Sequence, residues 1–250
     1  MSGRSLGRTV HFYDALQPDD VLGGLFLHPS VTQKNFLFML EILIVAADPY
    51  SVSVRATGAI LTPSEATLES GQYDIRSNIP GGTISITDEL CIERLISSTA
   101  SGRTEKFRNQ VRERHGKCVI TGTVKTMLYG NRWFGFEAAH VFPLCHEQLF
   151  VDSSFSRWIT NREGEHDSGI NSCQNGLLMQ SNIHEEFDGF CFSINPDDNY
   201  QVISFGDDPF RLDGRGLDPV CLAAHSERGV RDELLRWHFR QAVLVNMRGC

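Results

Sequence analysis

Four polar residues in the segment 136–188 constrain this chain more than any other feature of its sequence. An apolar run ends at His140, Asn175 follows a long polar stretch, and His184 comes nine residues after that asparagine. Asp188 is four positions beyond His184, so on a helix the two side chains share one face. An imidazole and a carboxylate that converge on one point suit a divalent cation such as Mg²⁺, Mn²⁺ or Zn²⁺. The spacing therefore predicts a metal site formed by His184 and Asp188.

The flanking segments predict two strands, a loop and a helix around these residues. Residues 118–122 are apolar and end in a glycine, and residues 132–141 predict a second strand that would pair with them as a hairpin. Residues 144–173 are long and polar, which predicts an irregular insertion with short helical pieces near residues 155–158. Residues 178–187 predict a short helix.

This frame places His140 at the end of a strand, from which we expect it to point toward the metal site. There it would act as a general base that removes a proton from the attacking water, while the metal takes up charge on a phosphate. Asn175 would hydrogen-bond the His140 ring or its backbone and hold one tautomer. Glu137 is three positions from His140, so strand alternation puts it on the opposite face, and we favour an exposed strand residue for it.

Four pieces of sequence, in this order and spacing, resemble the HNH nuclease superfamily, which has the ββα-metal fold, and in particular the HNH domains of fungal proteins. The pieces, within about residues 115–205, are Cys118-Val119-Ile120-Thr121-Gly122, Glu137-Ala138-Ala139-His140-Val141-Phe142-Pro143, Asn175-Gly176-Leu177-Leu178 and His184-Glu185-Glu186-Phe187-Asp188. The resemblance implies that His140 is the general base, Asn175 the central asparagine and His184 a metal ligand. Asp188 matches the position of a further ligand. Many members place Asp or His immediately before the base, and here that residue is Ala139, so a divalent metal would rest on His184 and Asp188 with water or phosphate.

The remaining sequence predicts an α+β fold around this ββα-metal HNH core. Residues 1–100 predict an N-terminal α+β region, and a polar break at residues 97–102 marks the expected boundary to an HNH-like domain at residues 101–250. The further elements expected are a helix at residues 31–47, strands at 9–13, 51–61, 71–75 and 83–87, a helix at 104–115, strands at 190–194 and 200–205, and a long C-terminal helix at 226–247.

Composition limits the class of protein and its compartment. The 250 residues are 41% hydrophobic and 22% charged, the balance of a soluble globular protein. The longest apolar run, residues 36–47, is interrupted by Glu41 and is too short for a membrane span, and no secretory signal follows Met1. The seven cysteines are widely spaced without a CxxC motif, so we expect free thiols and an intracellular protein of the cytoplasm or nucleus.

The net charge of −8 at pH 7 argues against strong binding to nucleic acid, because proteins that bind it usually carry a basic footprint. One basic concentration precedes the candidate site: Arg103, Lys106, Arg108, Arg112, Arg114 and Lys117. We interpret it as the solvated face of a helix.

Two classes of enzyme fit these residues. The first is an HNH-type metal-dependent endonuclease that hydrolyses phosphodiester bonds, with nucleic acid as its partner. The second is an HNH fold repurposed as a cyclase, isomerase or hydrolase on a small apolar metabolite of fungal secondary metabolism, with His140 as acid or base and no metal. Aromatic residues would line the apolar pocket of that second enzyme, or would only pack in the core: Phe134, Phe136, Phe142, Phe150, Phe155 and Trp158. A third interpretation is a silent interaction module that forms a homodimer through the C-terminal helix.

Overall fold

The fold comes from a computed structural model that describes residues 5–92, 104–126, 130, 132–162, 164, 166–222 and 227–248. Helices and strands are mixed along the chain, which confirms the expected α+β class. The break expected at residues 97–102 lies outside the described ranges, so the division into residues 1–100 and 101–250 stays a prediction. No helix in the described part of the chain is long and apolar enough to cross a membrane.

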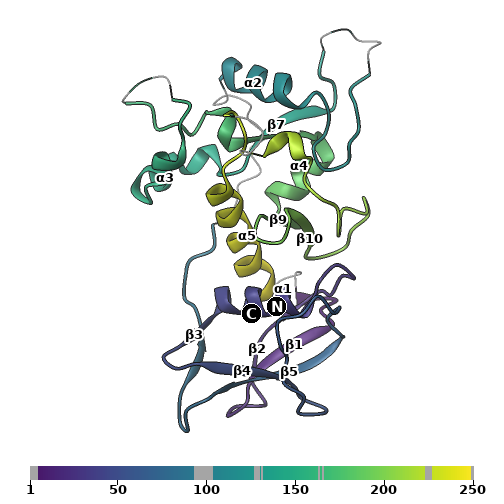
Figure 1. The fold of residues 1–250 in the computed structure, drawn as a ribbon, viewed down its shortest axis with the longest axis vertical. Helices are drawn as coiled ribbons and strands as arrows, with labels where there is room; N and C mark the ends of the chain where they lie inside the picture. The colour runs from purple at the N-terminus through teal and green to yellow at the C-terminus, as the bar shows by residue number, and fades with distance from the viewer. Residues whose placement is uncertain are drawn as a thin grey trace.

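The N-terminal region is built on a four-stranded mixed sheet in the order β2-β1-β5-β4 (Figure 1). β1 runs parallel to β5, whereas the β1–β2 and β4–β5 pairs are antiparallel. A second, two-stranded sheet pairs β3 with β6. The elements are β1 (Val10–Asp14), β2 (Val21–Leu25), α1 (Gln33–Leu43), β3 (Ile44–Ala46), β4 (Tyr50–Val54), β5 (Gly71–Ser77) and β6 (Ile84–Ile86).

Helix α1 begins where expected but ends earlier than its apolar pattern predicts. Thr32 caps its N-terminus, with the side-chain oxygen accepting from Asn35 N at 3.1 Å. The helix was expected to reach residue 47, but the backbone turns extended at Ile44 and continues as β3. The β-branched pair Ile44-Val45 fits a strand, and pairing with β6 supplies the backbone hydrogen bonds that a longer helix would have made.

Strand β4 is likewise shorter than the strand expected at residues 51–61. The chain turns at Gly58, which has a φ of +71°, and folds back so that Leu61 N donates to Val52 O at 2.8 Å. An apolar segment after the turn was therefore mistaken for a continuation of the strand.

The second half of the chain contains a strand–strand–helix unit, but its hairpin differs from the one expected. β7 (Phe136–His140) pairs antiparallel with β8 (Gly176–Gln180), and α4 (Ser181–Asp188) follows directly. The expected partner, residues 118–122, forms no strand; it turns back on itself through a bond from Gly122 N to Cys118 O at 2.9 Å. The two strands that carry the site are thus joined by the whole segment 141–175 rather than by a turn.

Helices lie on both faces of this hairpin. α2 (Glu105–His115) covers one face, and α4 lies against the other (Figure 1). Gly176 is the point of closest approach to α2, because a Cβ there would lie 2.6 Å from the Phe107 ring. The remaining elements are α3 (Glu147–Asp152), the short 3-10 turns Leu144–His146, Phe155–Trp158, Cys173–Asn175 and Pro219–Cys221, the hairpin β9 (Phe192–Asn195) and β10 (Gln201–Ser204), and α5 (Asp232–Met247).

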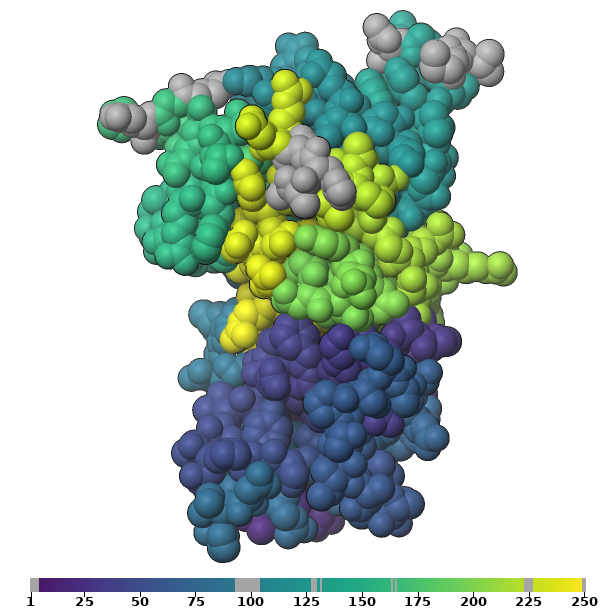
Figure 2. Space-filling view, viewed as in Figure 1, coloured from purple at the N-terminus to yellow at the C-terminus, as the bar shows by residue number. Residues whose placement is uncertain are grey.

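The long helix α5 joins the two halves of the molecule. Leu234 and Trp237 belong to the core around β7 and β8, whereas Phe239 and Met247 belong to the core around α1 and the N-terminal sheet. The β9–β10 hairpin also touches the N-terminal half, where Asn35 Nδ2 donates to Asp198 Oδ2 at 2.9 Å. Figure 2 shows the N-terminal residues in purple and blue packed against this hairpin in green and α5 in yellow.

Burial of α5 bears on the expected homodimer. Most of its residues are buried within the chain, including Leu234, Leu235, Phe239 and Leu244. The apolar face on which we expected a second copy to dock is therefore occupied by the protein's own two cores. A homodimer stays a prediction that needs another surface.

Candidate functional site

His140 lies at the end of β7, with its side chain held against α2. The ring stacks on Phe107, with centroids 4.1 Å apart and planes at 7°, and only 4% of the residue is exposed. Nε2 lies 3.2 Å from Asn171 Oδ1. Because an amide oxygen only accepts, Nε2 would be the donor in this contact, and a neutral ring would then carry its lone pair on Nδ1. A general base needs such a lone pair in a fixed orientation.

Asn175 closes the long segment that follows β7. Its Oδ1 accepts from Phe142 N at 2.8 Å, and its Nδ2 donates to Phe142 O at 3.0 Å and to Ile170 O at 2.9 Å. The side chain is fully buried. We expected Asn175 to bond the His140 ring or its backbone. The bonds join Phe142, two residues further on, so Asn175 fixes the path of the chain just after His140.

His184 and Asp188 lie together on α4, as their spacing predicts. His184 Nε2 is 3.1 Å from Asp188 Oδ2, and the opposite ring nitrogen, Nδ1, is 2.6 Å from Glu137 Oε2. The imidazole is 6% exposed, whereas the Glu137 side chain is 41% exposed. Glu137 was expected to be an exposed strand residue without a part in the site. It is instead the direct partner of His184.

The two histidines lie on different faces of the hairpin. Side chains alternate along a strand, so His140 and its cross-strand partner Gly176 face α2, where both lie near the ring of Phe107. Glu137 points to the other face, where α4 presents His184. The structure therefore differs from the expectation that His140 points toward the His184–Asp188 pair.

The His184–Asp188 pair fits part of the coordination shell of a hard divalent cation. In an octahedral shell with ligands at about 2.1 Å, neighbouring ligand atoms are about 3 Å apart, close to the 3.1 Å between Nε2 and Oδ2. A carboxylate on the other ring nitrogen, as Glu137 provides, is the usual partner that orients a ligating histidine. Within the described ranges no group of three His, Cys, Asp or Glu side chains is placed to hold a metal, and Ala139 adds no ligand. A cation here would rest on two side chains, with water or phosphate completing the shell.

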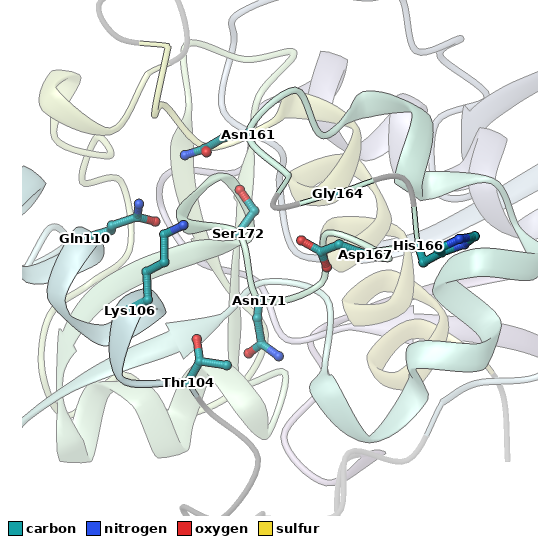
Figure 3. A pocket seen from close by; sticks show the side chains of 9 residues that line it. All are labelled: Thr104, Lys106, Gln110, Asn161, Gly164, His166, Asp167, Asn171 and Ser172. Carbon is teal, nitrogen blue, oxygen red and sulfur yellow. The ribbon is translucent and has the colours of Figure 1, made fainter.

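A polar cavity of about 350 Å³ adjoins His140 through Asn171. Its lining comes from the start of α2 and from the end of the segment before β8: Thr104, Lys106, Gln110, Asn161, Gly164, His166, Asp167, Asn171 and Ser172. Lys106 extends from α2 toward Ser172, and Asp167 points inward, whereas the ring of His166 points away (Figure 3). A second cavity of about 670 Å³ shares Gln110 and Asn161 and adds Arg228 and Arg231.

Arg114 and His115, at the end of α2, form hydrogen bonds to the backbone of β8 and of the segment just before it. The Arg114 guanidinium donates to three backbone carbonyl oxygens, those of Cys173, Gly176 and Arg228. His115 Nδ1 accepts from Leu178 N at 3.1 Å. Burial, and then the charge of Arg114, lower the pKa of His115 to about 2, so this ring is neutral at pH 7. Both side chains thus fix β8 against α2.

The aromatic residues near the site pack on one another. Phe142 contacts Phe150, Phe155 and Trp237, with ring centroids between 4.1 and 5.2 Å apart, and Phe142 and Phe150 are fully buried. Phe134, in contrast, is 59% exposed. These rings therefore form core rather than the wall of the apolar pocket that the second class of enzyme requires.

Three residues of the site were missed or discounted from the sequence. Glu137 was discounted because it alternates with His140, and a site on the other face of β7 was not considered. Asn171 and Phe107 contact the His140 ring from segments far away in sequence. No sequence pattern marked Asn171, four positions before Asn175, as a residue that would contact His140.

Two segments of the chain match known families. Residues 118–195 match a family described as HNH endonuclease. The chain contains an HNH domain. Residues 7–82 match a second family, described as a domain of unknown function (DUF8573). The searches of curated proteins and of solved structures gave no match.

The matched segments agree with the two halves of the structure. The HNH match runs from the turn at Cys118 to the end of β9 at Asn195, and it includes His140, Asn175, His184 and Asp188. The other match covers the N-terminal sheet and α1. A nuclease-type activity is thus supported at the level of the family, and nucleic acid is the substrate that it implies.

Proposed function

We propose that the chain is a metal-dependent endonuclease that hydrolyses phosphodiester bonds. His140 is the general base, Asn175 positions the chain after it, and His184 and Asp188 are the metal ligands. The observation that carries the proposal is the setting of His184, with Glu137 on one ring nitrogen and Asp188 beside the other. That arrangement orients an imidazole for ligation, and it lies within the residues that match HNH endonuclease.

His140 would accept a proton from the attacking water at Nδ1. Asn171 holds Nε2 at 3.2 Å, and Phe107 fixes the plane of the ring. Lys106, on the wall of the adjoining cavity, offers positive charge for a phosphate. A bound divalent cation would supply charge stabilisation for the phosphate and the leaving oxygen.

The substrate would have to reach both faces of the β7–β8 hairpin, because His140 lies on one face and His184 lies on the other. In the described part of the chain, β7 pairs only with β8, so its other edge has no neighbouring strand. A phosphodiester that reaches both rings would cross that edge near the end of β7. The alternative enzyme, on a small apolar metabolite, is less well supported because the rings that would line its pocket pack together.

Cleavage of supercoiled plasmid with Mn²⁺ tests the proposal. We expect nicking by the wild type, its loss with excess EDTA, and a rate lower by about 10²–10⁴-fold in His140→Ala, the usual contribution of a general base. His184→Ala should also lose tight Mn²⁺ binding measured by calorimetry. His11→Ala, in the N-terminal sheet, is the matched control and should leave both properties unchanged. Nicking at the wild-type rate by folded His140→Ala would contradict the assigned base.

A further inference from the structure

A group of basic and aromatic side chains gathers on the flank of α2 away from the cavity, next to the start of β7. We call it the basic–aromatic patch, and its members are Arg108, Arg112, Lys125, Arg132, Trp133 and Phe134. The Trp133 ring has the Arg112 guanidinium 5.5 Å from its centroid and the Lys125 ammonium 4.5 Å from it. The Arg132 guanidinium lies 5.8 Å from the centroid of Phe134. Cations and rings are thus interleaved, as they are on surfaces that bind unpaired bases.

The described residues do not neutralise the positive charge of the patch. None of its four cations has an ion pair with a carboxylate among the described residues. Several cations elsewhere are paired with a carboxylate, for example Arg55 with Asp74, Lys117 with Asp218, Arg236 with Asp197 and Arg240 with Glu89. In a chain with a net charge of −8, four unpaired cations in one place are unexpected.

Arg108 and Arg112 make this clustering costly for the folded protein. They are one helical turn apart on α2, where like charges repel. Burial, and then the charge of Arg108, lower the pKa of Arg112. The Nε of Arg112 is buried and has no hydrogen-bond partner in the described structure. An anionic partner would relieve the repulsion and satisfy this group.

The two rings differ in a way that suits stacking. Trp133 is half-buried and is anchored edge-on against Phe136, with centroids 6.2 Å apart and planes at 76°. Phe134 is 59% exposed, an unusual position for a phenylalanine. A half-buried ring beside an exposed one offers aromatic surface on which bases can stack, since every base has a π face.

The basic–aromatic patch lies next to the candidate site, because it ends where β7 begins. Phe136, which anchors Trp133, begins β7, and the next residue is Glu137, the partner of His184. Gly135 O accepts from Ser181 N at 2.9 Å, which ties the end of the patch to the start of α4. The chain between Trp133 and Glu137 turns, because Phe136 N donates to Trp133 O at 3.1 Å, so Trp133 lies next to the start of β7. A strand held on the patch would therefore reach the His184–Asp188 pair within a few nucleotides.

We propose that the basic–aromatic patch binds single-stranded nucleic acid and delivers it to the site. Bases stack on Trp133 and Phe134, and the phosphates pair with the four cations. A duplex is a poorer ligand because its bases are already stacked and cannot reach these rings. The inference rests on the proposed function, since it names the substrate class of that site, but binding to the patch is measurable without cleavage.

Fluorescence anisotropy with a labelled oligothymidylate in EDTA tests the patch. We expect the wild type to bind it more tightly than a duplex of the same length. Lys125→Ala/Arg132→Ala should reduce the slope of log K against log salt by about 1 to 2, because two phosphate contacts are lost. Phe134→Ala should weaken binding by about fivefold or more, the usual loss when a stacking ring is removed. Arg76→Ala and Phe210→Ala, exposed residues outside the patch, are the matched charge and ring controls and should bind as the wild type does.

Six outcomes separate the patch from the proposed function. Weaker binding in the patch variants with unchanged melting temperatures supports the patch, and so does intact binding by His140→Ala. Equal binding of duplex and single strand, or equal losses in the control variants, overturns it. Displacement of the oligonucleotide by polyglutamate at the same charge concentration also overturns it, because the surface would then be a general polyanion site. Tight, patch-dependent binding without any metal-dependent cleavage would support the patch and reject the nuclease.

Discussion

The N-terminal region and the second half of the chain differ in what they bury. We call the described residues from 104 to 248 the HNH half, because residues 118–195 within it match HNH endonuclease. In the described part of the N-terminal region, Asp14 and Asn35 are the buried polar side chains. The HNH half buries many more, among them His115, His140 and His184. A buried polar group costs stability unless it is hydrogen-bonded, so such groups persist where they do something besides pack. The N-terminal half thus resembles an ordinary apolar core, and the HNH half resembles a frame built around polar residues.

The largest expected difference between the halves concerns a single half-buried arginine. Arg114→Met removes the guanidinium that donates to the carbonyls of Cys173, Gly176 and Arg228, and leaves these oxygens without that donor. We expect a loss of about 3 kcal/mol in the free energy of unfolding by urea. Arg76→Met, an exposed arginine on β5, should change it by less than about 0.5 kcal/mol. Equal effects of the two substitutions would remove the contrast between the halves.

Acid should weaken the HNH half through His115. The pKa of this ring is about 2 in the folded protein, below its ordinary value of 6.5, so the unfolded chain takes up a proton that the folded protein refuses. The stability from the neutral ring is present in full above about pH 6.5 and is lost as the pH falls. Between pH 6.5 and 5 the loss is about 2 kcal/mol, at 1.36 kcal/mol per pH unit.

Urea unfolding at both pH values measures this loss. His115→Asn, whose amide oxygen can still accept from Leu178 N, should flatten the pH dependence by a similar amount. His11→Asn in the N-terminal sheet is the matched control. An unchanged pH dependence in His115→Asn would show that other groups drive the acid effect.

The smallest expected effect belongs to a surface pair of the N-terminal sheet. Arg55 Nε donates to Asp74 Oδ1 at 2.8 Å, and both side chains are about a quarter exposed. A double-mutant cycle of Arg55→Met and Asp74→Asn should give a coupling of about 0.5–1 kcal/mol, which 1 M salt reduces further. A coupling energy as large as the loss of stability in Arg114→Met would mean that polar interactions stabilise both halves to the same extent.

The sequence alone predicted that His184 and Asp188 lie together on a helix, and it predicted most of the helices and strands. The four-residue spacing of His184 and Asp188 requires only one turn of helix, which is local information. Thr104 and Gly116 likewise bound α2 as expected, the first as an N-cap and the second in the left-handed region. Strand β8 was missed, because the buried run Leu177-Leu178-Met179 has neither a strand period nor a helix period.

The arrangement of the site depended on contacts between distant segments. The partner of β7 lies beyond the whole segment 141–175, so no turn signal identified it, and a nearer apolar run took its place in the prediction. The same error hid the two faces of the hairpin, and with them the pairing of Glu137 with His184. The basic residues of α2 were interpreted as a solvated face because Trp133, whose ring Arg112 contacts, is more than fifteen positions further along the chain.

Helix α5 has a consequence for how the protein is made. Residues of α5 complete both cores: Trp237 belongs to one, and Phe239 and Met247 belong to the other. Gly23, on β2, lies so close to Met247 O that there is no room for a Cβ. Neither core is complete until α5 has been translated and has packed against both. The apolar residues that α5 covers therefore stay exposed on the nascent chain up to that point, and their burial is a step that the two halves share.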